Sequence, residues 1–240
     1  MKTLGLLGGM SWESSAVYYR RLNEGVRERL GGQHSAKLVM WSADFAPIAE
    51  MQAIGRWGEA TALLCDAARG LQRAGADAIL ICANTMHRMA AEVAAAVAVP
   101  LIHVADVTAD AIRAAGVERP LLLATGFVME QPFYRERLRA RGVDTLVPPQ
   151  AERRRLHAII FDELVQGRFA AASRAEVIGM IDRAVAEHAA DAVIFGCTEI
   201  GMLVPAEDPS VPVFDTLELH VAAGLAFALG QPSGRAPPVK

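Results

Sequence analysis

One cysteine lies where an apolar segment ends in a polar turn. Residues 192–196, Ala-Val-Ile-Phe-Gly, are followed directly by Cys197, Thr198 and Glu199. If a turn or helix begins here, its free N–H groups and positive dipole end favour a thiolate or bind a carboxylate. A thiolate becomes a general base once its pKa falls below the ordinary value of about 8.5. Most cysteines at the end of an apolar strand are small buried hydrophobes, so both interpretations stay open at this point.

A second polar turn follows the apolar residues 78–82 and contains Asn84, Thr85 and His87. Amide and hydroxyl groups at a helix N-terminus are good partners for a substrate carboxylate or ammonium group. Asn84 or Thr85 could equally cap the next helix, and the two roles are compatible. His87 is either part of this site or a polar residue on a helix face.

The other two cysteines are expected in the core. Cys82 precedes by one residue the position that aligns with Cys197, and adjacent side chains of a strand point to opposite faces. Cys65 lies among Ala and Leu residues in a helical pattern. The chain has no CxxC motif and no His/Cys cluster, so we expect no metal site and no disulfide framework.

These turns must be positioned by parallel strands connected by helices, because short apolar runs alternate with longer amphipathic segments. The continuous apolar character of the runs predicts sheets covered on both faces. The expected strands are residues 3–7, 37–42, 78–82, 101–104, 121–124, 145–147, 192–195 and 213–214. The expected helices are residues 12–30, 59–74, 86–97, 107–115, 131–141, 151–166 and 174–189. Ser11 fits a helix N-cap, Pro132 a first helical turn, and Gly31 and Gly142 fit helix ends.

The chain also repeats itself. Residues 77–85 align with residues 191–199, and a Val-Pro pair precedes a later strand in both halves. We therefore predict an α/β fold of two pseudo-symmetric three-layer α/β/α domains with mainly parallel sheets. The expected division is residues 1–116 plus 215–230 for the first domain, 117–214 for the second, and a flexible tail at 231–240. Ligands bind at the carboxyl ends of strands in such sheets, so the active site is expected in the cleft between the domains.

Composition excludes several classes of protein. Of 240 residues, 52% are hydrophobic and 21% charged, which is typical of a globular protein. The formal net charge of −3 gives no electrostatic footprint for nucleic acid or a membrane surface. The N-terminal apolar run is too short for a signal peptide, and no stretch of about 18 apolar residues exists. We expect a cytoplasmic, soluble protein.

Three motifs together carry a family resemblance. They are Gly8-Gly9-Met10-Ser11-Trp12, Asn84-Thr85-Met86-His87 and Cys197-Thr198-Glu199. Over nearly its whole length the sequence resembles the aspartate/glutamate racemase family, most closely its broad-specificity amino-acid racemase branch. The resemblance implies a racemase without cofactor or metal, acting as a homodimer on aspartate, glutamate or a similar amino acid. In that family one thiolate removes the α-proton while an acid on the opposite face returns one.

Carried over by resemblance, Cys197 is the catalytic proton donor and acceptor. The substrate-binding positions that the resemblance implies are Met10, Gln52, Ala83, Asn84, Thr85, Thr125, Thr198 and Glu199. Arg168 is a candidate for holding a side-chain carboxylate, or else a surface residue. The run Arg153-Arg154-Arg155 reads as a solvated helix face.

The sequence departs from the family where its first catalytic cysteine falls, because Ala83 has no titratable atom. Val128 also stands where relatives often carry threonine. Two-base racemisation is therefore expected to be weak or one-sided. Two alternatives are a single-cysteine decarboxylase or lyase acting on a related dicarboxylate, and a catalytically silent amino-acid-binding protein.

Overall fold

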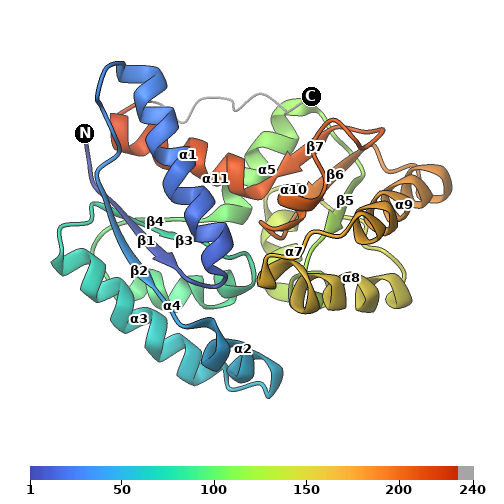
Figure 1. Ribbon diagram of the computed structural model, residues 1–240, viewed down its shortest axis with the longest axis horizontal. Helices are drawn as coiled ribbons and strands as arrows, with labels where there is room; N and C mark the ends of the chain where they lie inside the picture. Colours follow the sequence, from blue (N-terminus) through green and yellow to red (C-terminus); the bar gives the residue numbers. More distant parts are fainter. Residues whose placement is uncertain (232–240) are drawn as a thin grey trace. The chain divides into compact units, whose positions relative to one another are not determined.

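The computed structural model describes residues 1–231, which form two compact units (Figure 1). Within the described residues, the first unit contains residues 1–103 and 220–231, and the second unit runs from Val104 to Leu219. In this part of the chain, the connections between the units are His103–Val104 and Leu219–His220.

The first unit is built on a four-stranded parallel sheet of order β2-β1-β3-β4. Its strands are β1 (Leu4–Gly8), β2 (Leu38–Ser42), β3 (Ala78–Ile81) and β4 (Leu101–Ile102). Its helices are α1 (Trp12–Leu30), α2 (Phe45–Ala53), α3 (Trp57–Arg73), the 3-10 helix η1 (Thr85–Met89), α4 (Ala90–Ala95) and most of α11 (Thr216–Leu229).

This sheet is covered on both faces, as its apolar strands predict. Leu7, Ile79 and Ile81 belong to one hydrophobic cluster together with Leu64 and Leu71 of α3. On the other face, Gly224 brings the backbone of α11 so close that a Cβ there would lie 3.1 Å from Leu80 and 3.4 Å from Leu4. Helix α1 lies beside α11 on this face (Figure 1). The first unit is thus a three-layer α/β/α structure.

The second unit has a three-stranded parallel sheet of order β5-β6-β7. Its strands are β5 (Pro120–Leu123), β6 (Ala192–Phe195) and β7 (Val213–Asp215), and Leu146 adds an isolated parallel bridge to Leu121. Its helices are α5 (Val104–Ala115), α6 (Gly126–Glu130), α7 (Pro132–Ala140), α8 (Gln150–Asp162), the 3-10 helix η2 (Leu164–Gln166), α9 (Ala171–His188) and α10 (Ile200–Leu203).

The internal repeat is a structural repeat. In each unit the strand that follows the repeated aspartate, β3 or β6, pairs with the unit's first strand, β1 or β5. The Asp77 carboxylate accepts a hydrogen bond from the backbone N–H of Thr3, 2.7 Å away, just before β1. The Asp191 carboxylate accepts hydrogen bonds from the backbone N–H groups of Glu118, at 2.8 Å, and Arg119, at 2.9 Å, just before β5. Both aspartates therefore join the starts of two neighbouring strands.

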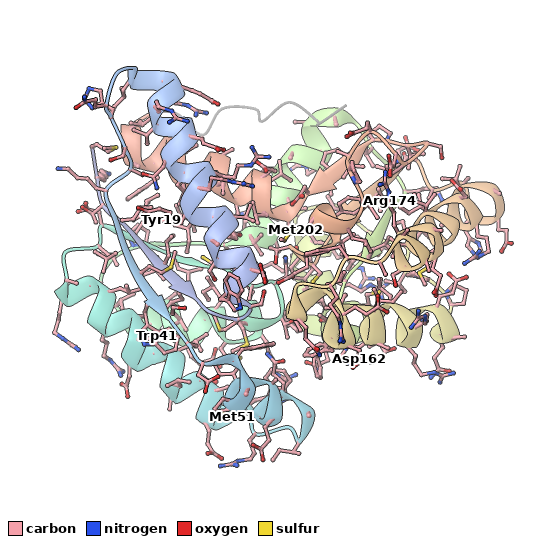
Figure 2. The ribbon with its side chains drawn as sticks, in the orientation of Figure 1. Tyr19, Trp41, Met51, Asp162, Arg174 and Met202 are labelled. Carbon is pink, nitrogen blue, oxygen red and sulfur yellow. The ribbon has the colours of Figure 1, made fainter. Side chains whose placement is uncertain are left out.

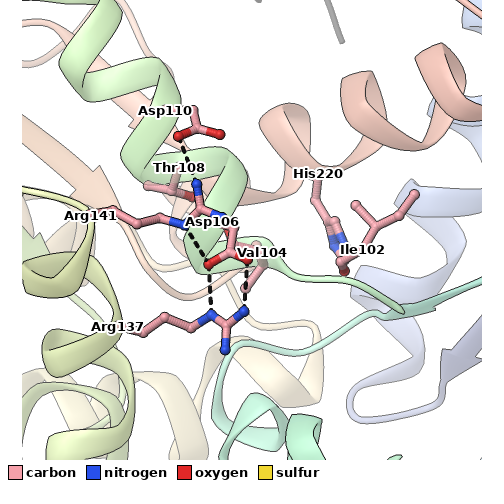
Figure 3. A network of polar contacts seen from close by, with 8 residues as sticks. All are labelled: Ile102, Val104, Asp106, Thr108, Asp110, Arg137, Arg141 and His220. Carbon is pink, nitrogen blue, oxygen red and sulfur yellow. Dashed lines mark hydrogen bonds and ion pairs between the residues drawn. The ribbon is translucent and has the colours of Figure 1, made fainter. Parts of the chain in front are cut away.

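The division between the units lies before α5 rather than after residue 116, the expected boundary. The Asp106 carboxylate of α5 pairs with Arg137 of α7 at 2.7 Å and with Arg141 at 2.9 Å (Figure 3). Ile112 of the same helix belongs to the hydrophobic cluster of the second unit. Residues 215–219 also belong to the second unit, since Asp215 pairs with Phe195 in the sheet. Side-chain contacts of this kind are not visible in hydropathy patterns.

Several elements differ from the expected ones. The helix expected over residues 86–97 is divided into η1 and α4, and the one expected over 151–166 ends at Asp162 before η2. Residues 145–147 form only the Leu146 bridge. Four helices were not expected: α2, α6, α10 and α11. The expected flexible tail, apart from Gln231, lies outside the described residues. No helix within residues 1–231 is long and apolar enough to cross a membrane.

Candidate active site

The turn after β6 places Cys197 beside a carboxylate. Gly196, the residue after β6, is still bonded to β5, because its N–H donates to the carbonyl of Leu123 at 2.7 Å. A Cβ at Gly196 would lie 2.7 Å from Leu122, so no larger residue fits there without displacement. The next residue, Cys197, is buried, and its Sγ–H donates to Glu199 Oε2 at 3.0 Å.

Glu199 Oε2 receives a second hydrogen bond, from the Thr198 hydroxyl at 2.8 Å. Glu199 is only 3% exposed, so its carboxylate is held by protein donors. A buried carboxylate needs such donors, because burial without them is costly. The three consecutive residues that the sequence singled out therefore form one hydrogen-bonded group, with Glu199 as its acceptor.

The electrostatics of this turn disfavour a thiolate, which is one of the two possibilities that a helix beginning here raised. Burial raises the pKa of the Cys197 thiol well above its ordinary value, and the neighbouring Glu199 carboxylate raises that pKa further. The helix that follows, α10, has only four residues. A helix this short offers little dipole stabilisation, whereas burial and the carboxylate at hydrogen-bond distance both favour the protonated thiol. Cys197 therefore lies next to a group that can accept its proton.

Thr125 follows β5 in the same unit and is buried. It is the N-cap of α6, where its hydroxyl accepts from the N–H of Val128 at 3.4 Å. Val128, the donor of that hydrogen bond, is fully buried. Thr125 and Cys197 thus both follow strands at the carboxyl edge of the β5-β6-β7 sheet.

In the first unit the equivalent turn follows β3. Ala83, Asn84 and Thr85 are all buried at this edge of the sheet. The Asn84 side chain makes no capping hydrogen bond to η1, so plain helix capping does not account for it. The Ala83 carbonyl accepts from His87 Nδ1 at 3.0 Å. His87 is therefore a buried histidine held against this turn, not a residue on an exposed helix face.

Gln52 and Met10 are buried in the same unit. The Gln52 amide nitrogen lies 3.0 Å from the sulfur of Met86, while its Oε1 is buried without a hydrogen-bond partner in the described chain. An unsatisfied buried acceptor costs about 1–3 kcal/mol, so it marks a place where a ligand donor would be stabilised. Figure 2 shows Met51, the residue before Gln52, on α2, a helix that hydropathy did not indicate.

The other candidate residues lie in the core or on the surface. Cys65 and Cys82 are buried core residues whose thiol pKa values are raised by burial. Arg168 is exposed, and its guanidinium donates to the carbonyl of Asp162 at the end of α8. This contact supports the surface interpretation of Arg168.

Sequence reasoning missed a buried histidine cluster in the first unit. The ring centroids of His87 and His103 lie 4.6 Å apart, and those of His87 and His220 lie 5.7 Å apart. His220 Nε2 donates to the carbonyl of Ile102 at 2.7 Å (Figure 3), and the Tyr18 hydroxyl lies 2.9 Å from its Nδ1. Burial lowers the pKa of His220 to about 4. Tyr18 and His220 are separated by 202 residues, so no local motif signals their contact.

Comparison with known proteins identifies the family. The model of the Asp/Glu/hydantoin racemases matches residues 7–224. A candidate Asp/Glu racemase from Yersinia pestis is 45% identical, with a TM-score of 0.87 over 95% of this chain and 100% of that one. An aspartate racemase homologue from Pyrococcus horikoshii OT3 is 32% identical, with a TM-score of 0.83 over the same shares of 95% and 100%.

A variant of arylmalonate decarboxylase shares the fold at 14% identity, with a TM-score of 0.56 over 100% of this chain and 96% of that one. At that identity only the fold is comparable. The family match covers both repeated turns, including Cys197-Thr198-Glu199 and Asn84-Thr85. The chain is a member of the Asp/Glu/hydantoin racemase family.

Proposed function

We propose that this protein is an amino-acid racemase of the aspartate/glutamate type that needs no cofactor and uses Cys197 as its proton donor and acceptor. The observation that carries the proposal is the buried hydrogen bond from Cys197 to Glu199 Oε2, at 3.0 Å. A thiol beside a carboxylate can both lose and regain a proton within a single site. We also propose, as the resemblance implies, that it acts in the cytoplasm as a homodimer on aspartate, glutamate or a related amino acid.

The proton moves in two balanced steps. Glu199 takes the thiol proton of Cys197, and the resulting thiolate takes the α-proton of the substrate. The electron pair of the broken C–H bond is delocalised into the substrate carboxylate. Donors to that carboxylate stabilise the developing charge, and we assign this role to the amide and hydroxyl groups of Asn84, Thr85 and Thr125. We assign the unpartnered Oε1 of Gln52 to the substrate ammonium group.

Ala83 makes the reaction asymmetric. Inversion requires removal of a proton on one side of the α-carbon and delivery on the other. Position 83, where the resemblance places the second catalytic acid, is an alanine and has no group that can titrate. We propose that water or Thr85 supplies the second proton slowly. Exchange of the α-proton by Cys197 should therefore be faster than net inversion.

The neutral state of Cys197 favours one second candidate, a decarboxylase acting on a related dicarboxylate. After loss of carbon dioxide, the carbanion needs one proton on one face, and a single thiol acid can deliver it. Release of carbon dioxide from a substituted malonate would identify this reaction. It requires no group at position 83.

Proton NMR in deuterium oxide tests the proposal. L- and D-aspartate and glutamate are incubated with the wild-type protein, with Cys197→Ser and with Cys65→Ser as a matched control in the core. We expect loss of the α-proton signal with wild type and Cys65→Ser, and none with Cys197→Ser, because serine is a far weaker acid. Ala83→Cys should raise the rate of inversion, measured by optical rotation. Unchanged exchange in Cys197→Ser would refute the assigned role.

A further inference from the structure

We propose that a hollow in the second unit binds the carboxylate group of a small organic acid. Its volume is about 500 Å³, within the size range of small-molecule pockets. Arg153, Arg154 and His157 of α8 line it together with Gly126, Phe127 and Glu130 of α6 and the following Gln131. None of Thr125, Cys197, Thr198 or Glu199 lines this hollow, so the proposal is independent of the proposed function.

The charges in the hollow do not balance. Arg153 Nε pairs with Glu130 at 2.9 Å, and its Nη1 donates to the Pro148 carbonyl at 2.8 Å. Arg154 is exposed, and its guanidinium has no ion-pair or hydrogen-bond partner in the part of the chain that the structure describes. The adjacent Arg155 differs, because it pairs with Glu176 at 2.7 Å. The arginine run is therefore not a uniformly solvated face, and Arg154 leaves one uncompensated positive charge at the hollow.

His157 supplies a neutral donor. The backbone N–H of Gly126 donates to His157 Nδ1 at 3.1 Å, so in the neutral ring the hydrogen is on Nε2. Burial lowers the pKa of His157, which keeps the ring neutral near pH 7. The ring is held between Phe127, at a centroid distance of 5.4 Å, and Phe161, at 4.6 Å. Its plane and its tautomer are thus both set by the surrounding residues.

These features select a monoanion. A guanidinium offers two parallel N–H groups that match the two oxygens of a carboxylate. One unpaired positive charge and one neutral donor balance a single negative charge, whereas a phosphate dianion would add excess negative charge near Glu130. The ring of Phe127 offers an apolar surface for the body of the ligand. The ligand class is accordingly a carboxylate on an aromatic or aliphatic body.

Titration of ¹⁵N-labelled full-length protein with sodium benzoate at constant ionic strength tests this site. The amide resonances of Gly126 and Phe127 report on the hollow directly. We expect saturable shifts in the wild type and in Arg155→Gln, which removes the same charge one residue away. In Arg154→Gln the affinity should fall by about tenfold or more, as for loss of a charged hydrogen-bonding partner. Circular dichroism checks that both variants fold.

Benzyl alcohol and inorganic phosphate complete the test. Neither should shift these resonances as benzoate does, because one lacks the charge and the other lacks the apolar body. No saturable shift with benzoate would overturn the proposal, as would equal affinity in Arg154→Gln and wild type. Tighter binding of phosphate than of benzoate would overturn the ligand class. Cys197→Ser should bind benzoate like the wild type, which separates this site from the proposed active site.

Discussion

The replacement Glu199→Gln separates two effects of this carboxylate on Cys197: its charge raises the thiol pKa, and its oxygen is the proposed acceptor of the thiol proton. Glutamine keeps the size of the side chain and an oxygen that accepts a hydrogen bond, but it has no negative charge and takes up no proton. The Glu199 charge raises the pKa of Cys197, so removing it should lower that pKa and make the thiolate available at lower pH. The same change removes the group that we propose accepts the thiol proton.

The expected rate follows from the geometry. The distance of 3.0 Å from Cys197 Sγ to Glu199 Oε2 is within the range for direct proton transfer. A correctly placed general base contributes roughly 10²–10⁴-fold, so α-proton exchange should fall by that factor in Glu199→Gln. In Glu199→Gln the fraction of Cys197 present as thiolate should thus rise, while the rate of α-proton exchange should fall.

Two assays measure the two effects. The ultraviolet absorbance of the thiolate, followed against pH, gives the pKa of Cys197, with Cys197→Ser as the blank. Proton NMR in deuterium oxide gives the exchange rate of the substrate α-proton. Glu207→Gln is the matched control, because it makes the same chemical change at an exposed carboxylate of the same unit. It should retain the exchange activity.

A Glu199→Gln protein that exchanges the α-proton as fast as wild type, or faster, would show that Glu199 is not the proton acceptor. An unchanged or higher pKa of Cys197 would show that the Glu199 charge does not control the thiol. Either result refutes the reasoning from the short hydrogen bond.

Three further predictions concern stability, each measured by urea unfolding. Asp191→Ala should cost about 1 kcal/mol more than Asp77→Ala, because Asp191 accepts two backbone N–H groups and Asp77 accepts one; equal losses would contradict this. The pKa of His220 is about 4 in the folded chain and 6.5 in the unfolded chain. Between these two pH values only the unfolded chain binds the proton, so the stability that is fully present above pH 6.5 is lost as the pH falls toward 4. The loss amounts to roughly 3 kcal/mol and should be absent in His220→Gln; the same pH slope in both proteins would refute it. Gly196→Ala should destabilise by about 1–3 kcal/mol, since its Cβ would lie 2.7 Å from Leu122; no loss would mean that the neighbouring side chains move aside freely.

Much of the fold was predictable because the buried strands are continuous apolar runs. Helix α1 begins and ends at the expected residues, with Ser11 as its N-cap and Gly31 as its C-cap. The repeat also located β3 and β6 and the turns that follow them. Short helices such as α6 and α10 were not predicted, because four or five residues are too few to show a helical period in hydropathy.

The motifs named candidate residues, Cys197 and Glu199 among them, but not their electrostatics. Only the three-dimensional structure shows that burial and the neighbouring carboxylate together raise the pKa of the Cys197 thiol. The pairing of Arg153 with Glu130 and of Arg155 with Glu176 was equally invisible, because each joins residues on different helices. Sequence gives charges, and only the fold decides which of them remain unpaired.

The order of the two units along the chain has a consequence for synthesis. In the part of the chain that the structure describes, the second unit is one continuous segment, so it can fold as soon as Leu219 has left the ribosome. The first unit must wait, because α11 covers one face of its sheet and the N–H of Lys2 donates to the carbonyl of Ala228 at 2.8 Å. The first unit, which contains residues 1–103, therefore completes its folding after the second unit. Until then, Leu4 and Leu80 lack the helix that covers them, and the nascent chain exposes an apolar surface that chaperones recognise.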